Sequence, residues 1–240
     1  MKRVEVAALT SRGLVRAGNE DRVSVFGWSA PREMTEPVLL TRETSEPVLV
    51  VVADGLGGHQ AGEVASEFAV TALHTALPDV AADPARAFGR VHEDLLALGA
   101  SQPELEGMAT TATALLVTDV ITICHVGDSR AYYVEPGFVS QLTTDHVEPG
   151  GALTQVLGGR PGREVVPQVR EVESAECSRF LLCSDGLHSY VDAAVVREGA
   201  ALESSFGAAR ALLRAAVEAG APDNVSVCVV TVWLEGEKNR

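Results

Sequence analysis

The chain has 240 residues, of which 46% are hydrophobic and 22% are charged, as expected of a soluble globular protein with one large domain or two small ones. The formal net charge of −14, from 33 acidic and 19 basic residues, argues against a sequence-independent nucleic-acid surface, which needs clustered lysine and arginine. No apolar run approaches the roughly 18 residues of a membrane span, no secretion signal is recognised, and the 4 cysteines are expected to be reduced in a cytosolic protein.

The first part of the chain predicts strands joined by polar loops. Residues 4–11 alternate in polarity, a polar loop covers 11–21, and residues 21–28 alternate again. Residues 29–47 are irregular and rich in proline, and the apolar piece at 36–40 is interpreted as an edge strand or an exposed loop. The short apolar run at 49–53 predicts a buried strand that runs into Asp54.

Apolar residues then follow a helical period. Residues 61–77 carry them at i, i+3, i+4 and i+7, and Pro78 is expected to end this helix. Asp83 and Pro84 predict an N-cap and a first helical residue, and the helix that they open is expected to end near Gly99. Two consecutive helices between strands predict an antiparallel pair lying on a sheet.

The second half predicts further strands and two helices. Strands are expected at 111–118, 120–127, 130–134, 138–142, 165–172, 178–184 and 224–234. Thr118 and Asp119 indicate a short hairpin connection, Asp192 and Ser204 are typical N-caps, and Gly220 ends the longer helix. Short connections and paired helices favour an α+β fold, a layered sandwich of mainly antiparallel sheets with helices outside, over a doubly wound parallel fold.

Five aspartates lie at the ends of the predicted core strands. Predicted strands end at Asp54, Asp128 and Asp185. Two other predicted strands begin at Asp21 and Asp223. In an antiparallel sheet the end of one strand lies beside the beginning of its neighbour, so all of these side chains can converge on one end of the sandwich. Each aspartate alone has an equally simple interpretation as a turn or cap residue. Their joint occurrence indicates a site.

Converging carboxylates raise one another's pKa values, and a hard divalent cation removes this cost. Oxygen ligands suit Mg²⁺, Mn²⁺ or Ca²⁺, and without a nearby Cys or His cluster a zinc site is not expected. Two ions about 3.5–4 Å apart can lower the pKa of a shared water and make it a nucleophile for phosphate esters. Arg16 and His59 are the candidates for binding the phosphate and protonating the leaving group, although each alone also fits an ordinary surface arginine or loop histidine.

The order of the short motifs resembles a known family. The motifs lie at 16–21, 54–59, 107–111, 125–130, 144–146, 153–158, 183–187 and 223–226. This series resembles the metal-dependent type 2C serine/threonine protein phosphatases of bacteria, in their stand-alone form, and it spans nearly the whole chain. The resemblance implies a four-layer α-β-β-α sandwich with two central antiparallel sheets flanked by antiparallel helix pairs, and Mn²⁺ or Mg²⁺ as the cofactor.

The resemblance also implies a metal-binding role for most of the aspartates. Asp54 would bridge two divalent cations, and the carbonyl of Gly55 would bind one of them. Asp185 and Asp223 would complete the first ion. Asp21 would support the second, directly or through water.

The remaining roles follow from the same resemblance. Glu20 would act beside Asp21 at the second ion, and Arg16 would hold the substrate phosphate. His59 would correspond to the general acid. Asp128 would match a weaker third metal site that bacterial members have.

The chain departs from the family pattern in two places. Ala109 stands where the family has the second glycine of a Gly-Met-Gly-Thr-Thr motif. Only residues 147–152 lie where bacterial relatives carry a longer flap, so the metal centre is expected to be more open, and the third metal site is left undecided. We expect one type 2C phosphatase domain over residues 1–235, followed by a charged tail at 236–240.

The favoured function is a phosphoprotein phosphatase that hydrolyses phosphoserine and phosphothreonine and opposes a bacterial Ser/Thr kinase. One alternative is a non-catalytic relative that binds a regulatory partner, which would be expected to lose metal ligands. The other is a phosphatase dedicated to one partner in stress signalling, whose relatives have degenerate motifs and attached sensor domains. The expected partners are phosphoserine and phosphothreonine proteins and a cognate kinase, with no nucleic acid and no membrane, for a cytoplasmic monomer.

Overall fold

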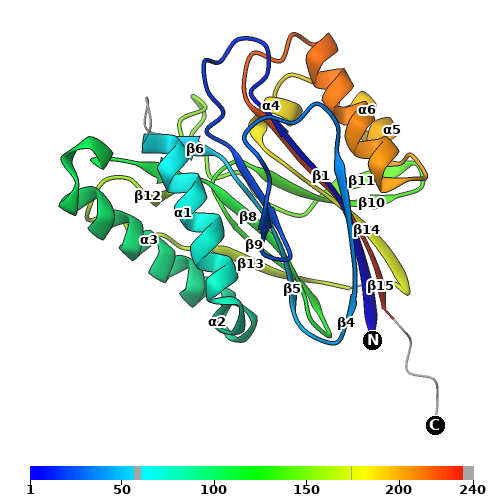
Figure 1. Ribbon diagram of the computed structural model, residues 1–240, viewed down its shortest axis with the longest axis horizontal. Helices are drawn as coiled ribbons and strands as arrows, with labels where there is room; N and C mark the ends of the chain where they lie inside the picture. The colour runs from blue at the N-terminus through cyan, green and yellow to red at the C-terminus, as the bar shows by residue number, and fades with distance from the viewer. Residues whose placement is uncertain (57–60, 174, 235–240) are drawn as a thin grey trace.

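A computed structural model describes residues 1–56, 61–173 and 175–234. Two six-stranded sheets form the centre of the molecule, and helices cover their outer faces (Figure 1). All strand pairings within these sheets are antiparallel. The expected α-β-β-α sandwich is therefore confirmed.

The first sheet contains both ends of the described chain. Its strands, in spatial order, are β11 (Phe138–Gln141), β10 (Arg130–Glu135), β14 (Cys177–Cys183), β15 (Val225–Leu234), β1 (Lys2–Ser11) and β4 (Val38–Thr44). β1 and β15 pair along their full length, from Lys2 with Leu234 to Ser11 with Val225. The segment after Pro37, which the sequence left as an edge strand or a loop, is the edge strand β4.

The second sheet is built from the middle of the chain. Its strands, in spatial order, are β13 (Gln168–Val172), β9 (Ile121–Val126), β8 (Ala112–Val117), β5 (Val48–Ala53), β2 (Arg22–Val25) and β3 (Trp28–Ser29). The alternating run at 21–28 predicted one continuous strand, which is wrong. Phe26 and Gly27 have positive φ angles of 55° and 84°, and they make the turn between β2 and β3.

β5 is apolar at every position because both of its faces are buried. Val48, Val50 and Val52 belong to the core between the two sheets, whereas Leu49 and Val51 pack under the helices. A strand that is buried on both faces has no solvent side on which polar residues would be favoured. β5 therefore contributes side chains to both the core between the sheets and the core under the helices.

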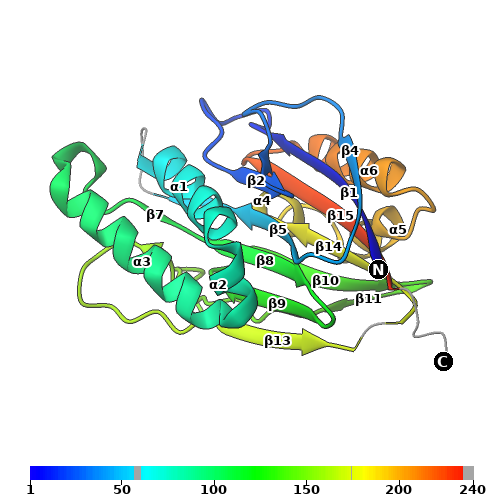
Figure 2. The same ribbon diagram turned by 60° about the horizontal axis from the view of Figure 1, so that its bottom comes forward.

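Helices cover the outer face of each sheet (Figure 2). The helices over the second sheet are α1 (Ala61–Thr75), the short α2 (Leu77–Ala82) and α3 (Pro84–Ser101), and those over the first are α5 (Ala193–Ala200) and α6 (Ser205–Glu218). The predicted N-caps are confirmed, because Asp83, Asp192 and Ser204 each accept a hydrogen bond from a backbone N–H in the first turn.

Pro78 does not act as the sequence predicted. α1 ends at Thr75, and Pro78 lies in the first turn of α2. Proline is tolerated there because the first N–H groups of a helix have no intrahelical partner. All 4 cysteines are free as expected, but Cys177 is exposed and only the other three are buried.

Three small features were not predicted. They are a three-stranded sheet of β12 (Leu157–Gly158), β7 (Ala109–Thr110) and β6 (Gly55–Leu56), the one-turn helix α4 (Asp185–His188) and a 3-10 turn at Pro103–Leu105. Each has fewer residues than a hydrophobic period needs to become visible in a sequence. The predicted tail at 236–240 lies outside the described residues.

Candidate metal centre

The strand register brings the aspartates to one end of the sandwich. Asp21 and Asp54 are one residue beyond Arg22 and Ala53, which pair across β2 and β5. In the first sheet, β10, β14 and β15 pair so that the residues next to Asp128, Asp185 and Asp223 also lie at one end. The predicted convergence is therefore a consequence of antiparallel pairing.

Asp54 is at the centre of this group. Burial raises the pKa of its carboxyl well above the ordinary value, and the charges of the four other aspartates raise it further. Burial also raises the pKa of Asp185, and the charge of Asp223 adds to this shift. Burial raises the pKa of Asp128 to about 6. Carboxylates affect one another in this way only when they lie close together.

Asp21 is the most enclosed of the five. Its Oδ2 accepts hydrogen bonds from the hydroxyls of Ser184 and Ser226, both at 2.7 Å. Its Oδ1 is buried and has no hydrogen-bond partner among the described residues. Burial raises its pKa to about 7, although the two hydroxyls oppose the shift. A buried oxygen without a partner is costly, and a cation or water beside it would remove the cost.

Two threonines fix the backbone of Asp54. The Asp54 N–H donates to Thr111 Oγ1 at 3.0 Å, and its carbonyl accepts from the Thr111 N–H at 2.8 Å and from Thr110 Oγ1 at 2.9 Å. Thr111 Oγ1 also shares a 2.8 Å hydrogen bond with Ser129 Oγ, next to Asp128. The sequence identified the motif at 107–111 but gave these threonines no role.

Gly55 lies where three backbone segments meet. A Cβ atom at this residue would be 2.2 Å from the carbonyl oxygen of Gly62 and 2.6 Å from that of Glu20. A Cβ at Gly62 would in turn be 2.5 Å from Glu20 Oε2. Glycine is therefore required for α1 to begin against Glu20 and for the backbone after Asp54 to approach the site.

Arg16 reaches the carboxylates from an exposed loop. Its guanidinium donates to Asp223 Oδ2 at 2.6 Å, although more than half of its side chain is exposed. This hydrogen bond raises the pKa of Arg16, with additional contributions from Glu20 and Asp185. The sequence predicted that Arg16 would lie beside the carboxylates, and the structure places its guanidinium on Asp223.

Asn224 is a site residue whose function the sequence did not reveal. Its amide donates to the carbonyls of Arg12 and Gly18 at 3.0 and 2.9 Å, and its Oδ1 accepts from the Glu20 N–H at 2.8 Å. Asn224 therefore closes both ends of the loop that carries Arg16. Its position directly after Asp223 was the only signal in the sequence.

Asp128 is connected to the rest of the site through α4. Its carbonyl accepts a 3.0 Å hydrogen bond from Nε2 of His188, the last residue of the helix that Asp185 begins. Residues 147–152 form a tight turn, in which the Glu148 N–H donates to the Ala152 carbonyl at 2.8 Å. His59 lies outside the described residues.

The donor set fits hard divalent cations. It offers carboxylate oxygens from five strand ends, raised carboxyl pKa values and an orphaned buried oxygen on Asp21. Within residues 1–56, 61–173 and 175–234, no three His, Cys, Asp or Glu side chains form a ready-made metal cage.

Comparison with known proteins decides the family. Residues 38–220 match the family described as Protein phosphatase 2C. The chain belongs to this family. Its protein phosphatase 2C relatives include the serine/threonine protein phosphatase PstP of Mycobacterium tuberculosis, which is 33% identical over 94% of this chain. The serine/threonine phosphatase stp of Listeria innocua is 30% identical over 92% of this chain and 93% of its own length.

Solved protein phosphatase 2C structures share the fold. The catalytic domain of PstP in complex with 2 manganese ions has a TM-score of 0.78 and 32% identity, over 98% of this chain and 100% of that one. The serine/threonine phosphatase of S. agalactiae has a TM-score of 0.79 and 25% identity, over 97% of this chain and 100% of that one. This chain spans 44% of the length of the full PstP relative. In the part of the chain that the structure describes, no helix is long and apolar enough to cross a membrane.

Proposed function

We propose that this chain is a metal-dependent phosphatase of phosphoserine and phosphothreonine in proteins. The observation that carries the proposal is the convergence of five buried or half-buried aspartates at one end of a sandwich shared with a manganese-bound phosphatase. The relatives named above are serine/threonine phosphatases. A non-catalytic role gains no support, because every aspartate of the constellation is present.

In this proposal the aspartates divide between two cations. Asp54 would contact both ions, and the Gly55 carbonyl would bind one of them. Asp185 and Asp223 would complete the first ion, and Asp21 with Glu20 would support the second, directly or through water. When bound, the cations, Mn²⁺ or Mg²⁺, would supply Lewis acidity and would lower the pKa of a water so that it can lose a proton near neutral pH.

The protein's own groups then orient the substrate. Arg16 would bind the phosphate through its guanidinium, which is suited to bidentate hydrogen bonds with phosphate oxygens. Ser184 and Ser226 fix the orientation of the Asp21 carboxylate, and Thr111 fixes the backbone of Asp54. His59 would give a proton to the leaving serine or threonine oxygen.

The decisive experiment is hydrolysis of p-nitrophenyl phosphate by the wild type and by Asp54→Ala, with Mn²⁺ and with EDTA. We expect Mn²⁺-dependent turnover that falls by about 10³-fold or more in Asp54→Ala, because the shared ligand is lost. Asp79→Ala, an exposed aspartate of α2 paired with Arg90, is the matched control and should keep full activity. Turnover in EDTA, or an active Asp54→Ala, would refute the metal mechanism.

Substrate class is tested separately. Phosphoserine and phosphothreonine peptides should be hydrolysed, and phosphotyrosine peptides of the same sequence should not. A preference for phosphotyrosine would contradict the proposed class. A cognate Ser/Thr kinase as the opposing enzyme, a monomeric state and a cytoplasmic location remain predictions from the sequence, as do the domain limits at 1–235.

The third metal site is also part of the proposal. Asp128 would hold a weaker third cation with Asp185, despite the short segment at 147–152. We expect isothermal titration calorimetry to count one Mn²⁺ fewer on Asp128→Ala than on the wild type. Equal stoichiometry in the two proteins would remove Asp128 from the ligand set.

A further inference from the structure

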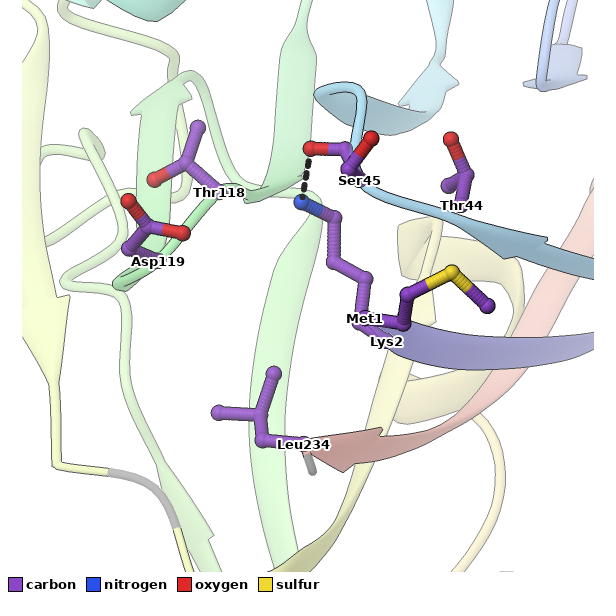
Figure 3. A pocket seen from close by; sticks show the side chains of 7 residues that line it. All are labelled: Met1, Lys2, Thr44, Ser45, Thr118, Asp119 and Leu234. Carbon is purple, nitrogen blue, oxygen red and sulfur yellow. Dashed lines mark hydrogen bonds between the residues drawn. The ribbon is translucent and has the colours of Figure 1, made fainter. Parts of the chain in front are cut away.

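A cavity of about 380 Å³ opens at the opposite end of the sandwich from the aspartates. Figure 3 shows the residues that line it. β1 begins at this cavity and β15 ends there, whereas their other ends lead to the Arg16 loop and to Asp223. Lys2, Ser45 and Leu234 line it from the first-sheet side, and Thr118 and Asp119 line it from the turn between β8 and β9. Its volume lies within the range of small-molecule sites, about 300–1,000 Å³.

Lys2 is a buried cation with unused hydrogen-bonding capacity. The residue is only 5% exposed, and its ammonium makes one hydrogen bond, to the Ser45 carbonyl at 3.2 Å. An ammonium has three donors, and no carboxylate among the described residues lies within ion-pair distance of Nζ. Burial lowers the pKa of Lys2, while Asp119 and Glu46 oppose this shift from a distance. An under-paired buried ammonium is costly unless a ligand or water completes its hydrogen bonds.

Asp119 supplies the opposite charge across the cavity. Its side chain is exposed and makes no hydrogen bond or ion pair among the described residues. The neighbouring Thr118 hydroxyl is already engaged, because it donates to the Val120 carbonyl at 2.9 Å and accepts from the Val120 N–H at 3.2 Å. Figure 3 shows the Asp119 carboxylate facing the Lys2 ammonium from the second sheet.

The third part of the cavity is apolar. The half-buried Leu234 lies below Lys2, on the side of Asp119, whereas the Met1 side chain is turned to the other side of Lys2, toward Thr44 (Figure 3). A free carboxylate entering alone would be attracted by Lys2 and repelled by Asp119, and a free amine would meet the reverse. A molecule that carries both charges next to an apolar group satisfies all three surfaces.

We propose that this cavity binds an α-amino acid with an apolar side chain, with its carboxylate on Lys2, its ammonium on Asp119 and its side chain against Leu234. Such a ligand contacts β1 and β15 of one sheet and the β8–β9 turn of the other. It therefore links the two sheets and stabilises the folded state by mass action. Binding at this cavity does not require phosphatase activity.

The test uses L-leucine as the probe and a chain with a free N-terminus and a C-terminal affinity tag. Isothermal titration calorimetry should show binding, and the melting temperature should rise with leucine concentration. 4-Methylpentanoate lacks the ammonium and 3-methylbutylamine lacks the carboxylate, so each should bind about tenfold more weakly or worse. Glycine, which lacks the side chain, should also bind more weakly.

Two variants assign the binding to this cavity. Lys2→Gln and Asp119→Asn should each weaken leucine binding by about tenfold or more, because each removes one charge. Glu218→Gln, on the exposed end of α6, is the control and should bind leucine like the wild type. The proposal is overturned if leucine fails to bind at about 10 mM, if either single-charge analogue binds equally well, or if Lys2→Gln binds leucine normally while it remains folded by circular dichroism.

Discussion

Asn224 shows how much of the site depends on a residue that would not contact the substrate. Its side chain is 6% exposed and makes three hydrogen bonds to the backbone at Arg12, Gly18 and Glu20. These bonds hold the loop from which Arg16 reaches Asp223. We therefore assign Asn224 to the positioning of Arg16, a role that depends on its two donors and its acceptor together.

Asn224→Ala should be strongly destabilising. Loss of three buried hydrogen bonds at about 0.5–1.5 kcal/mol each lowers the free energy of unfolding by roughly 1.5–4.5 kcal/mol. The KM for a phosphopeptide should rise more than kcat falls, because Arg16 would no longer be held. Urea unfolding and steady-state kinetics measure these effects.

Asn224→Asp provides the matched comparison. It keeps an acceptor for the Glu20 N–H but loses both donors and adds a carboxylate beside Asp223. The carboxylate would repel the carbonyls of Arg12 and Gly18, to which the amide donates, so the loop that carries Arg16 should open and KM should also rise. An unchanged KM in both variants would contradict the positioning role.

At the scale of elements, α4 is the piece that connects the two halves of the carboxylate cluster. It begins with Asp185 and ends with His188, which holds the backbone at Asp128. Gly186 allows α4 to lie against the beginning of β15, because a Cβ atom there would be 1.9 Å from the Asn224 carbonyl oxygen. The spacing between Asp185 and Asp223 therefore depends on a glycine.

Gly186→Ala should separate these elements. A clash with backbone cannot be relieved by a rotamer change, so we expect a loss of about 3 kcal/mol or more and a weaker affinity for Mn²⁺. Gly89→Ala is the control, because Gly89 lies in α3 and a Cβ atom added there would meet no atom within 4 Å beyond its own helical backbone. The control should gain about 0.5–1 kcal/mol from helix propensity. Equal stability of the two variants in thermal denaturation would disprove the close-approach argument.

Local sequence patterns correctly predicted those features that depend only on neighbouring residues. The caps at Asp83, Asp192 and Ser204 were correct, since a cap needs only its own first turn. The turn at Phe26 was missed, because a positive φ at a non-glycine residue has no clear sequence signal. The three-stranded sheet was missed for a different reason, since it joins segments that are distant in the chain. α4 was missed because a helix of 4 residues is too short to show a period.

On the scale of the whole molecule, the aspartate cluster makes stability depend on pH and on cations. Burial raises the pKa of Asp21 to about 7 and that of Asp128 to about 6, above the ordinary value of 3.8. The folded state therefore binds these protons more tightly than the unfolded state does. This contribution to stability is complete below pH 3.8 and is lost as the pH rises through about 6 and then 7.

The metal-free protein should therefore melt at a lower temperature at pH 8 than at pH 5, by about 2–4 °C for each kcal/mol lost. Mn²⁺ should raise the melting temperature more at pH 8, where protons no longer compete for the carboxylates. Differential scanning calorimetry in EDTA and in Mn²⁺ measures both effects. Asp21→Asn should flatten the dependence on pH in EDTA, and a melting temperature in EDTA that rises between pH 5 and pH 8 would contradict the argument.

The sequence by itself determined the sandwich, the strand ends at which the aspartates lie and the resemblance to a phosphatase family, because strands, caps and short motifs are encoded by neighbouring residues. Only the tertiary structure decided how the aspartates are held. Asp21 receives its hydroxyl partners from Ser184 and Ser226, which are 163 and 205 residues away along the chain. The cavity beside Lys2 likewise needs Asp119 from the other sheet. Such contacts form between segments that no local pattern relates, so they follow from the packing of the sheets.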